Sequence, residues 1–232
     1  MIEIVATTLE DALIIEECGV DRIELVSALS EGGITPSYGL IKKVVQTVKI
    51  PVNVIIRPHA RSFVYSKEEI EIMKEDIRIA RNCGANGVVF GILDENANIH
   101  IKFLEELLEI CENLNLEVTF HKAIDKLADI VEGVKILSQY SSIKTILTSG
   151  GKGDIVCNIH RIKQMMNHSG HITIMPGGGL TFENIEKVAR ATGARAFHFG
   201  TAVRQNSSPN GKIDKIKLTR MIKIIESIRE EE

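Results

Sequence analysis

Four side chains that can take part in acid–base chemistry or anion binding occur within or just after short apolar segments. Glu3 and Glu24 each stand in a run of Ile, Val and Leu, while Arg57 and His121 each end such a run. Carboxylates and an imidazole can exchange protons with a bound molecule. A guanidinium group binds carboxylate or phosphate through paired donors. We therefore take all four residues as catalytic candidates.

A purely structural role is the alternative for the two acids. A carboxylate buried without a partner is costly, so Glu3 and Glu24 each need a cation or a backbone donor. Arg57 or Arg22 could supply that partner and hold neighbouring strands together without any substrate. His198, which stands between two phenylalanines, is either a hydrogen-bonded core histidine or a further member of the site. The sequence leaves these alternatives open.

Two glycine-rich segments form a candidate anion site. One of them leads from an apolar run into a segment with helical spacing, and the other follows the last apolar run. Backbone N–H groups near a helix start attract phosphate and carboxylate groups. Glycines at these places can also serve simply to permit tight turns. The residues concerned are Gly177, Gly178, Gly179, Gly200 and Thr201. The sequence leaves open whether a metal binds.

A regular alternation of strands and helices must position these residues. Three similar junctions, at Gly19, Gly84 and Gly193, combine a glycine suited to the left-handed end of a helix with a short apolar strand. The spacing of apolar residues predicts strands at Ile2–Ala6, Arg22–Val26, Val52–Arg57, Gly87–Gly91, Glu117–His121, Thr145–Ser149, Ile172–Met175 and Ala196–Gly200. It predicts helices at Leu9–Cys18, Pro36–Val48, Lys67–Cys83, Ile101–Asn113, Asp129–Gln139, Asp154–Asn167, Phe182–Thr192 and Asp214–Glu230.

This alternation favours the α/β class and a single (β/α)8 TIM barrel over residues 1–232. Strands that are apolar on both faces are typical of a parallel sheet covered by helices. An open doubly wound sheet is the alternative, but the Gly-x-Gly-x-x-Gly turn common in such sheets is absent after the first strand. In a barrel, the chemistry lies where strands end, which would place the four candidates at one rim.

The composition argues against several classes of protein. The chain has 28 Lys and Arg against 31 Asp and Glu, a net charge of -3, so we expect no nucleic-acid partner. Its apolar runs are shorter than the ~20 residues of a membrane helix, and its first residues do not resemble a signal peptide. The 4 cysteines show no C-x-x-C spacing, which suits reduced thiols. We expect a soluble, cytoplasmic protein.

Several longer motifs resemble the CutC family, known as copper homeostasis proteins. They are DRIELVSALSEGGITPSYG, IPVNVIIRP, VTFHKAID, ILTSGG and IMPGGGLTFENI, and together they span nearly the whole chain. The resemblance implies a TIM barrel, a cytoplasmic location, a homodimer and a part in copper handling. Copper is expected as a cofactor from this resemblance only. It also implies a shared polar ring of Glu3, Glu24, Arg57 and His121.

The chain departs from the family pattern at residues that bear on copper. Members argued to bind copper have cysteines at the positions of Val5 and Val26, and Cu(I) selects soft thiolate ligands. The segment IRPHARSF also differs from the family's IRPRGGDF. We therefore expect no thiolate copper site at the barrel mouth.

Two functions stay in competition. One is a copper homeostasis protein that handles metal without such a site. The other is an enzyme that uses acid–base chemistry on a small anionic or phosphorylated metabolite. Whether the chain is an enzyme is left open by the sequence, because fold by itself proves no function.

Overall fold

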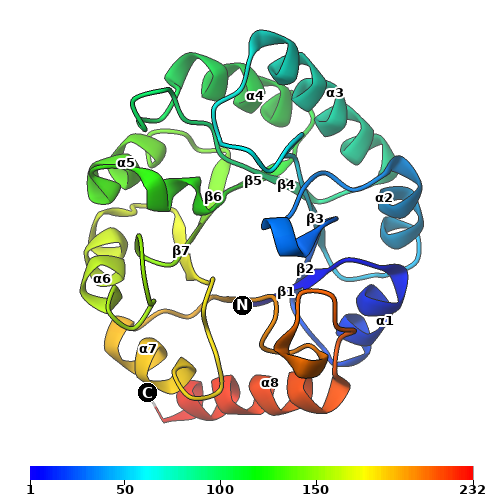
Figure 1. Ribbon diagram of the computed structural model, residues 1–232, viewed down its shortest axis with the longest axis vertical. Helices are drawn as coiled ribbons and strands as arrows, with labels where there is room; N and C mark the ends of the chain where they lie inside the picture. The colour runs from blue at the N-terminus through cyan, green and yellow to red at the C-terminus, as the bar shows by residue number, and fades with distance from the viewer. Residues whose placement is uncertain (232) are drawn as a thin grey trace.

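A computed structural model describes residues 1–231 and shows a (β/α)8 barrel, which confirms the predicted fold (Figure 1). Its parallel strands pair in the order β7-β6-β5-β4-β3-β2-β1-β8. Within the described residues, β7 and β8 pack together without a shared ladder, so the ring is nearly closed. The strands are β1 (Ile2–Ala6), β2 (Arg22–Leu25), β3 (Val52–Ile55), β4 (Gly87–Phe90), β5 (Glu117–Phe120), β6 (Ile143–Thr148), β7 (Thr173–Pro176) and β8 (Phe197–Phe199).

The helices form an outer layer around the strands (Figure 1). They are α1 (Leu9–Glu17), α2 (Tyr38–Val45), α3 (Lys67–Cys83), α4 (Ile101–Asn113), α5 (Ile130–Leu137), α6 (Ile159–His168), α7 (Ile185–Thr192) and α8 (Lys215–Glu230). Three short 3-10 helices follow strands and are η1 (Leu29–Glu31), η2 (Lys122–Lys126) and η3 (Gln205–Ser207). Among residues 1–231, no helix has both the length and the apolar character needed to cross a membrane.

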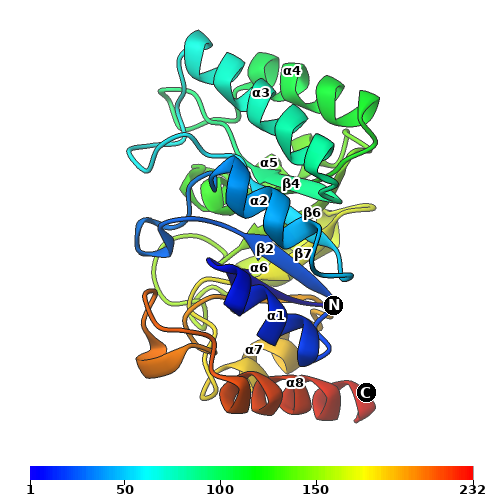
Figure 2. The ribbon, with the colours of Figure 1, turned by 90° about the vertical axis from the view of Figure 1, so that its right-hand side faces the viewer.

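The loops that follow the strands gather at one face of the barrel, because all strands run in the same direction. Figure 2 shows these loops on its left side, with both ends of the chain on the opposite side. The short helix η1, drawn in blue, lies close to the centre of the ring in Figure 1. The loop face is therefore the place where residues from different strands can meet.

Local signals fix several helix ends. Ser66 Oγ accepts a hydrogen bond from Glu69 N–H at 3.2 Å, and the Glu69 carboxylate accepts one from Ser66 N–H at 2.8 Å. This pair satisfies two N–H groups at the start of α3. Gly19, Gly84 and Gly193 have φ values of 77°, 100° and 73°, which glycine adopts without steric cost. The three predicted junctions are confirmed.

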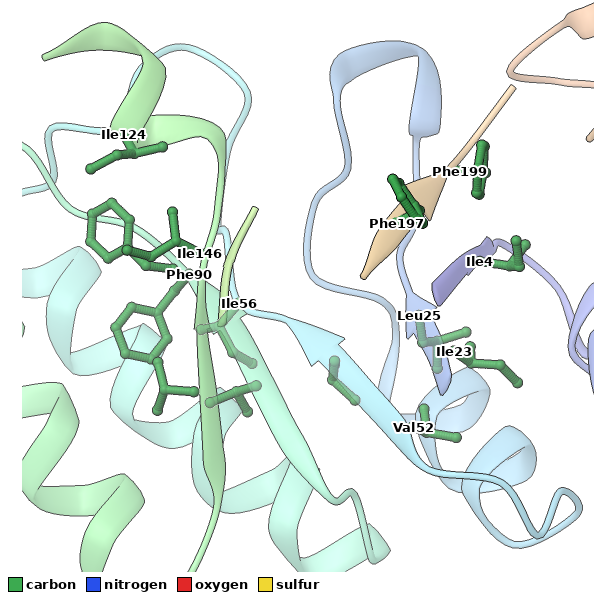
Figure 3. Packing of buried hydrophobic residues seen from close by; sticks show 14 of the residues in the cluster. Ile4, Ile23, Leu25, Val52, Ile56, Phe90, Ile124, Ile146, Phe197 and Phe199 are labelled. Carbon is green, nitrogen blue, oxygen red and sulfur yellow. The ribbon is translucent and has the colours of Figure 1, made fainter. Parts of the chain in front are cut away.

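Alternation along the strands divides the apolar residues between two sides of the sheet. Ile4, Ile23 and Leu25 are fully buried in the main core together with Phe197 and Phe199 of β8 (Figure 3). A separate small cluster consists of Val5, Val26, Ile55 and Val89. Fully burying each such side chain contributes about 1.5–3 kcal/mol. Side chains alternate along a strand, so Glu3 and Glu24 point to the side of the sheet opposite Ile4, Ile23 and Leu25. They therefore share a side with the small cluster.

Three helices begin two or more residues later than predicted, and side-chain hydrogen bonds lie where each of them was expected to begin. Ser37 Oγ accepts a backbone N–H at the start of α2, and Pro36 stays outside the helix. Before α6, the Asn158 amide donates to the Ser149 carbonyl at 3.0 Å. Before α7, Asn184 Oδ1 accepts a backbone N–H at 2.8 Å. The glycine segment at 177–179 therefore reaches α7 through an additional turn.

Candidate active site

Glu3 lies at the centre of a buried charged cluster. Its carboxylate accepts a hydrogen bond from Arg22 Nε at 2.5 Å and lies 2.7 Å from His198 Nδ1. Strand register explains this contact, because β1 pairs Glu3 with Arg22 on β2 and with His198 on β8. Burial alone would raise the pKa of Glu3, but the positive charges of Arg22 and His198 outweigh it and hold that pKa below 4.5. Because an ionised carboxylate only accepts, His198 Nδ1 carries a proton and donates it.

Glu24 is the second carboxylate of this cluster. Its Oε2 atom lies 3.7 Å from His198 Nε2, too far for a direct hydrogen bond. Burial raises the pKa of Glu24 to about 7. The positive charge of His198 lowers this pKa in part, and the negative charge of Glu3 adds to the rise. Burial also disfavours a charged His198, but Glu24 and Glu3 outweigh it and raise its pKa above 6.5. Two titratable groups with raised pKa values therefore face each other.

An inner cavity of about 220 Å³ lies beside this cluster at the loop face. Glu24, His198 and His121 all contribute to its wall. Its volume is below the roughly 300–1,000 Å³ of pockets for drug-sized ligands, so it suits a small metabolite. Its apolar wall includes Val5, Val26, Leu29, Ile55, Phe63, Leu147 and Phe199.

His121 follows β5 directly and is held in one orientation. The Ala123 N–H donates to its Nδ1 atom at 3.2 Å, and its ring packs on Phe63 with 4.7 Å between ring centroids. Burial lowers the pKa of His121 to about 3, and the positive charge of Arg57 adds to this effect. Among the described residues, its buried Nε2 atom has no hydrogen-bond partner. His121 is therefore neutral near pH 7 and keeps Nε2 for a ligand.

Arg57 follows β3 and lines a larger outer cavity of about 800 Å³. Its Nη1 atom donates to the carbonyls of Glu31 and Gly33 at 2.9 Å and 3.0 Å, and Nη2 donates to Ala60 at 3.1 Å. These bonds fix the loop around η1 over the mouth. The φ of 86° at Gly33 allows the chain to turn there. The inner and outer cavities meet, since Gly32, Phe63, Lys122 and Gly178 line both.

The structure thus divides the four catalytic candidates. Glu24 and His121 reach the same inner cavity, and Glu3 lies behind Glu24 with no exposed surface. Arg57 lines the outer cavity and donates to backbone carbonyls of its neighbouring loops. These residues lie at different depths around one mouth, which the sequence did not indicate, and their catalytic roles stay predictions.

The glycine segments lie against the same cavity. Gly177 does not line the cavity wall, and its N–H donates to the Thr148 carbonyl at 2.8 Å, so that N–H is not available to an anion. A side chain at Gly178 would collide with the ammonium group of Lys122. Within residues 1–231, Lys122 has neither an ion-pair nor a hydrogen-bond partner. The predicted anion residues on the cavity wall are Gly178, Gly179, Gly200 and Thr201.

The glycine loop after β6 is occupied by a carboxylate of the protein itself. Asp125 accepts hydrogen bonds from Ser149 N–H at 2.9 Å and from Gly151 N–H at 3.0 Å. The hydroxyls of Thr148 and Ser149 donate to it at 2.5 Å and 2.7 Å. These donors are therefore already satisfied, and the loop at Gly178 is the better place for an external anion.

Three members of the site were missing from the predicted catalytic set. His198 was left undecided, Arg22 was considered only as a structural partner, and Lys122 was not predicted to face the cavity. His198 lies in β8 and Gly200 directly follows that strand, and the spacing of two between them was a usable signal that both face the same side. No sequence signal shows that Lys122 lies against Gly178, because η2 and the loop after β7 are far apart in the chain.

The model of the CutC family matches residues 1–203. The chain belongs to the CutC family. The Copper homeostasis protein cutC homolog of Homo sapiens is 41% identical over 199 residues, which cover 85% of this chain and 72% of that protein. A family protein CutC of Pasteurella multocida is 38% identical over 210 residues, or 90% of this chain and 85% of that protein. The predicted family resemblance is confirmed.

Solved structures agree with the assignment to CutC. A CutC crystal structure from Streptococcus agalactiae, described as a copper homeostasis protein, superposes with a TM-score of 0.79 at 33% identity. That match covers 85% of this chain and 97% of the other. A phosphoribosyl anthranilate isomerase from Thermococcus kodakaraensis has a TM-score of 0.66 at 14% identity, covering 96% and 97% of the two chains. The isomerase therefore shows only that the fold is shared.

The sulfur atoms of this CutC chain lie away from the site. Cys18 follows α1 and is partly buried, while Cys83 and Cys111 lie within α3 and α4. Cys157 is exposed in the turn before α6, whereas the sequence predicted a helix there. Val5 and Val26, the two positions at which the family resemblance implied cysteines, lie on the cavity wall.

The altered loop of this CutC chain forms its own ion pairs. His59 Nε2 and Arg61 Nη2 lie 3.1 Å and 3.0 Å from the same Glu69 oxygen. Glu69 also caps α3, so the loop that follows β3 is tied to that helix. The substituted residues of the family pattern thus have a structural role in this chain.

Proposed function

We propose that this CutC protein is an acid–base enzyme that acts on a small anionic metabolite in the inner cavity. The observation that carries the proposal is the pair of Glu24 and His198, which face each other across 3.7 Å at the cavity wall. The pKa of Glu24, raised to about 7, supports it, because efficient proton transfer needs a pKa near the working pH.

Each charged group has a distinct task in this proposal. Glu24 exchanges a proton with the metabolite. His198 returns or removes that proton through Nε2, while Glu3 orients its ring from the other side through Nδ1. Arg22 keeps Glu3 ionised, so Glu3 stabilises a positive charge on His198 without taking up the proton. This arrangement resembles the division of labour in other acid–base sites, where a buried acid orients a histidine.

Lys122 and the loop at Gly178 provide the anion-binding end. Lys122 is unpartnered among the described residues and borders both cavities. Positive charge and backbone N–H groups together are the usual means of binding phosphate or carboxylate. We therefore assign anion binding to Lys122, Gly178, Gly179, Gly200 and Thr201, and the positioning of the mouth loop to Arg57.

Copper handling is the second candidate function, and the names of the relatives favour it. The donor set of the cavity fits Cu(I) poorly, because it contains no thiol and both nitrogens of His198 face carboxylates. Among residues 1–231, no group of three or more His, Cys, Asp or Glu could hold a metal ion. The cytoplasmic location and the homodimer that the family resemblance implies stay predictions.

Thermal unfolding with added ligands separates the two functions. At inorganic phosphate ten times above its Kd, bound anion should stabilise the protein by about 1.4 kcal/mol. That corresponds to a rise in Tm of roughly 3–5 °C for a chain of this size. Lys122→Ala should abolish the rise, whereas Lys187→Ala, which removes an exposed lysine of α7, should leave it unchanged.

The same preparation, reduced and titrated with Cu(I) against a competing chelator, should show no tight site. Tight one-to-one Cu(I) binding that His121→Ala removes would favour copper handling over the enzyme. Equal phosphate stabilisation of the wild type and Lys122→Ala would show that the anion binds elsewhere.

A further inference from the structure

The hydrogen bond at His121 determines which ring nitrogen carries the proton. Ala123 N–H donates to Nδ1 at 3.2 Å, so Nδ1 presents a lone pair. A neutral imidazole has one protonated nitrogen, so the proton is on Nε2. Nε2 is buried, lacks a partner within the described residues, and belongs to a side chain on the cavity wall. His121 therefore holds, at the cavity wall, a neutral N–H donor without a partner in the described part of the chain.

The surroundings of His121 fix this donor and keep it neutral. The ring packs on Phe63, and Gly91 leaves room for it, since any side chain at 91 would collide with Nδ1. Arg57 also stacks on Phe63, 4.9 Å from the ring centroid, so a positive charge lies close by. A second positive charge on His121 is therefore disfavoured. A group that cannot take up a proton cannot act as a base, but it can stabilise a developing negative charge.

We propose that the metabolite carries a carbonyl group whose oxygen accepts a hydrogen bond from His121 Nε2, and that the reaction transfers a proton at the neighbouring carbon. This inference rests on the proposed acid–base function. It assigns His121 as the electrophilic group and Glu24 as the base, both of which line one cavity. The substrate class is then a small aldehyde or ketone with an anionic end.

The proposed step is balanced without a co-reactant. The Glu24 carboxylate takes the proton from the carbon next to the carbonyl. The electrons of that C–H bond form a C=C bond, and the carbonyl π electrons move to oxygen, where the His121 N–H stabilises them. Return of the proton from Glu24 to the same carbon restores the C–H bond and the carbonyl, which completes a proton exchange at that carbon with no net oxidation. His121 keeps its proton throughout.

Binding of an enolate mimic tests the inference. Phosphoglycolohydroxamate combines a phosphate with a group that imitates an enolate, and inorganic phosphate serves as the matched probe without it. By calorimetry, the wild type should bind the hydroxamate roughly 10- to 100-fold more tightly than phosphate, as expected for a hydrogen bond to a charged group. His121→Gln can place an amide N–H near the position of Nε2 and should retain most of this gain. His121→Asn can still accept the Ala123 N–H, but its shorter side chain does not reach the position of Nε2. This variant should therefore lose the gain in affinity for the hydroxamate.

The outcomes separate this inference from the proposed function. If phosphate binds but the hydroxamate binds no tighter, the carbonyl inference is wrong and the anion site stands. If neither binds, both fail. A second measurement needs no variant with altered folding: long-range ¹H–¹⁵N spectra of the wild type should show a neutral His121 with its proton on Nε2. A proton on Nδ1 at pH 7, or a charged ring, would overturn the inference.

Discussion

Replacing Glu3 by alanine is expected to lower the free energy of unfolding by about 3–5 kcal/mol. Glu3 is wholly buried and contacts both Arg22 and His198. Its removal leaves the Arg22 guanidinium buried without its carboxylate, and it removes the acceptor for His198 Nδ1. Breaking a buried pair is costly because the remaining charge cannot recover its hydration. Urea unfolding at pH 7 measures the loss.

Glu186→Ala provides the matched control for Glu3→Ala. Glu186 also pairs with an arginine, Arg190, at 3.0 Å, but both side chains are largely exposed. Exposed pairs of this kind contribute about 0.3–0.5 kcal/mol. A loss for Glu3→Ala no larger than that of the control would mean that Glu3 does not hold the cluster together.

Glu24→Gln is expected to stabilise the protein by about 3 kcal/mol at pH 8 and to change little at pH 4.5. A carboxyl whose pKa moves from 4.5 to about 7 on folding holds a proton in the native state that the unfolded chain has already lost. At about 1.4 kcal/mol per pKa unit, the native state is progressively disfavoured as the pH rises through that window. Glutamine is neutral at every pH and avoids this cost. Unfolding curves of wild type and variant between pH 4 and 8 measure the difference.

The sign of this effect distinguishes Glu24 from an ordinary acid. Below pH 4.5 both the native and the unfolded carboxyl are protonated, so wild type and variant should have similar stability. Above pH 7 both are ionised, and the difference should reach its plateau. Glu112→Gln, at an exposed position of α4, is the control and should leave the pH dependence unchanged. A constant difference between wild type and Glu24→Gln at all pH values would contradict a raised pKa.

The barrel itself could be predicted because local patterns specify it. Alternating apolar segments and the glycines at 84 and 193 act within a few residues, so the sequence contains the information directly. The rule that catalytic residues lie at strand ends also pointed to Glu24 and His121, which line the same cavity. These inferences need only the direction of each strand and the alternation of its side chains between the two faces of the sheet.

The depth of each side chain could not be predicted in the same way, because it depends on the stagger between strands. The alternation of side chains indicates that Glu3 faces the inside of the barrel. Only the register between β1 and β8 shows that it lies opposite His198. Arg57 illustrates a second limit. Its three carbonyl partners lie in two loops, one of them more than 20 residues earlier, whose shape no local pattern determines. Helix starts after β6 and β7 were misplaced for a similar reason, since turns that contain the hydrogen-bonded side chains of Asn158 and Asn184 precede them.

The direct test of the account is the titration of Glu24 in the native protein. Carbon NMR of protein labelled with carboxyl-¹³C glutamate, with the Glu24 signal assigned by its absence from Glu24→Gln, follows this one group. We predict a midpoint at about 7, which shifts when His198→Asn removes the facing imidazole. A midpoint near 4.5 that is unaffected by His198→Asn would contradict the claim that these two residues exchange protons at the cavity.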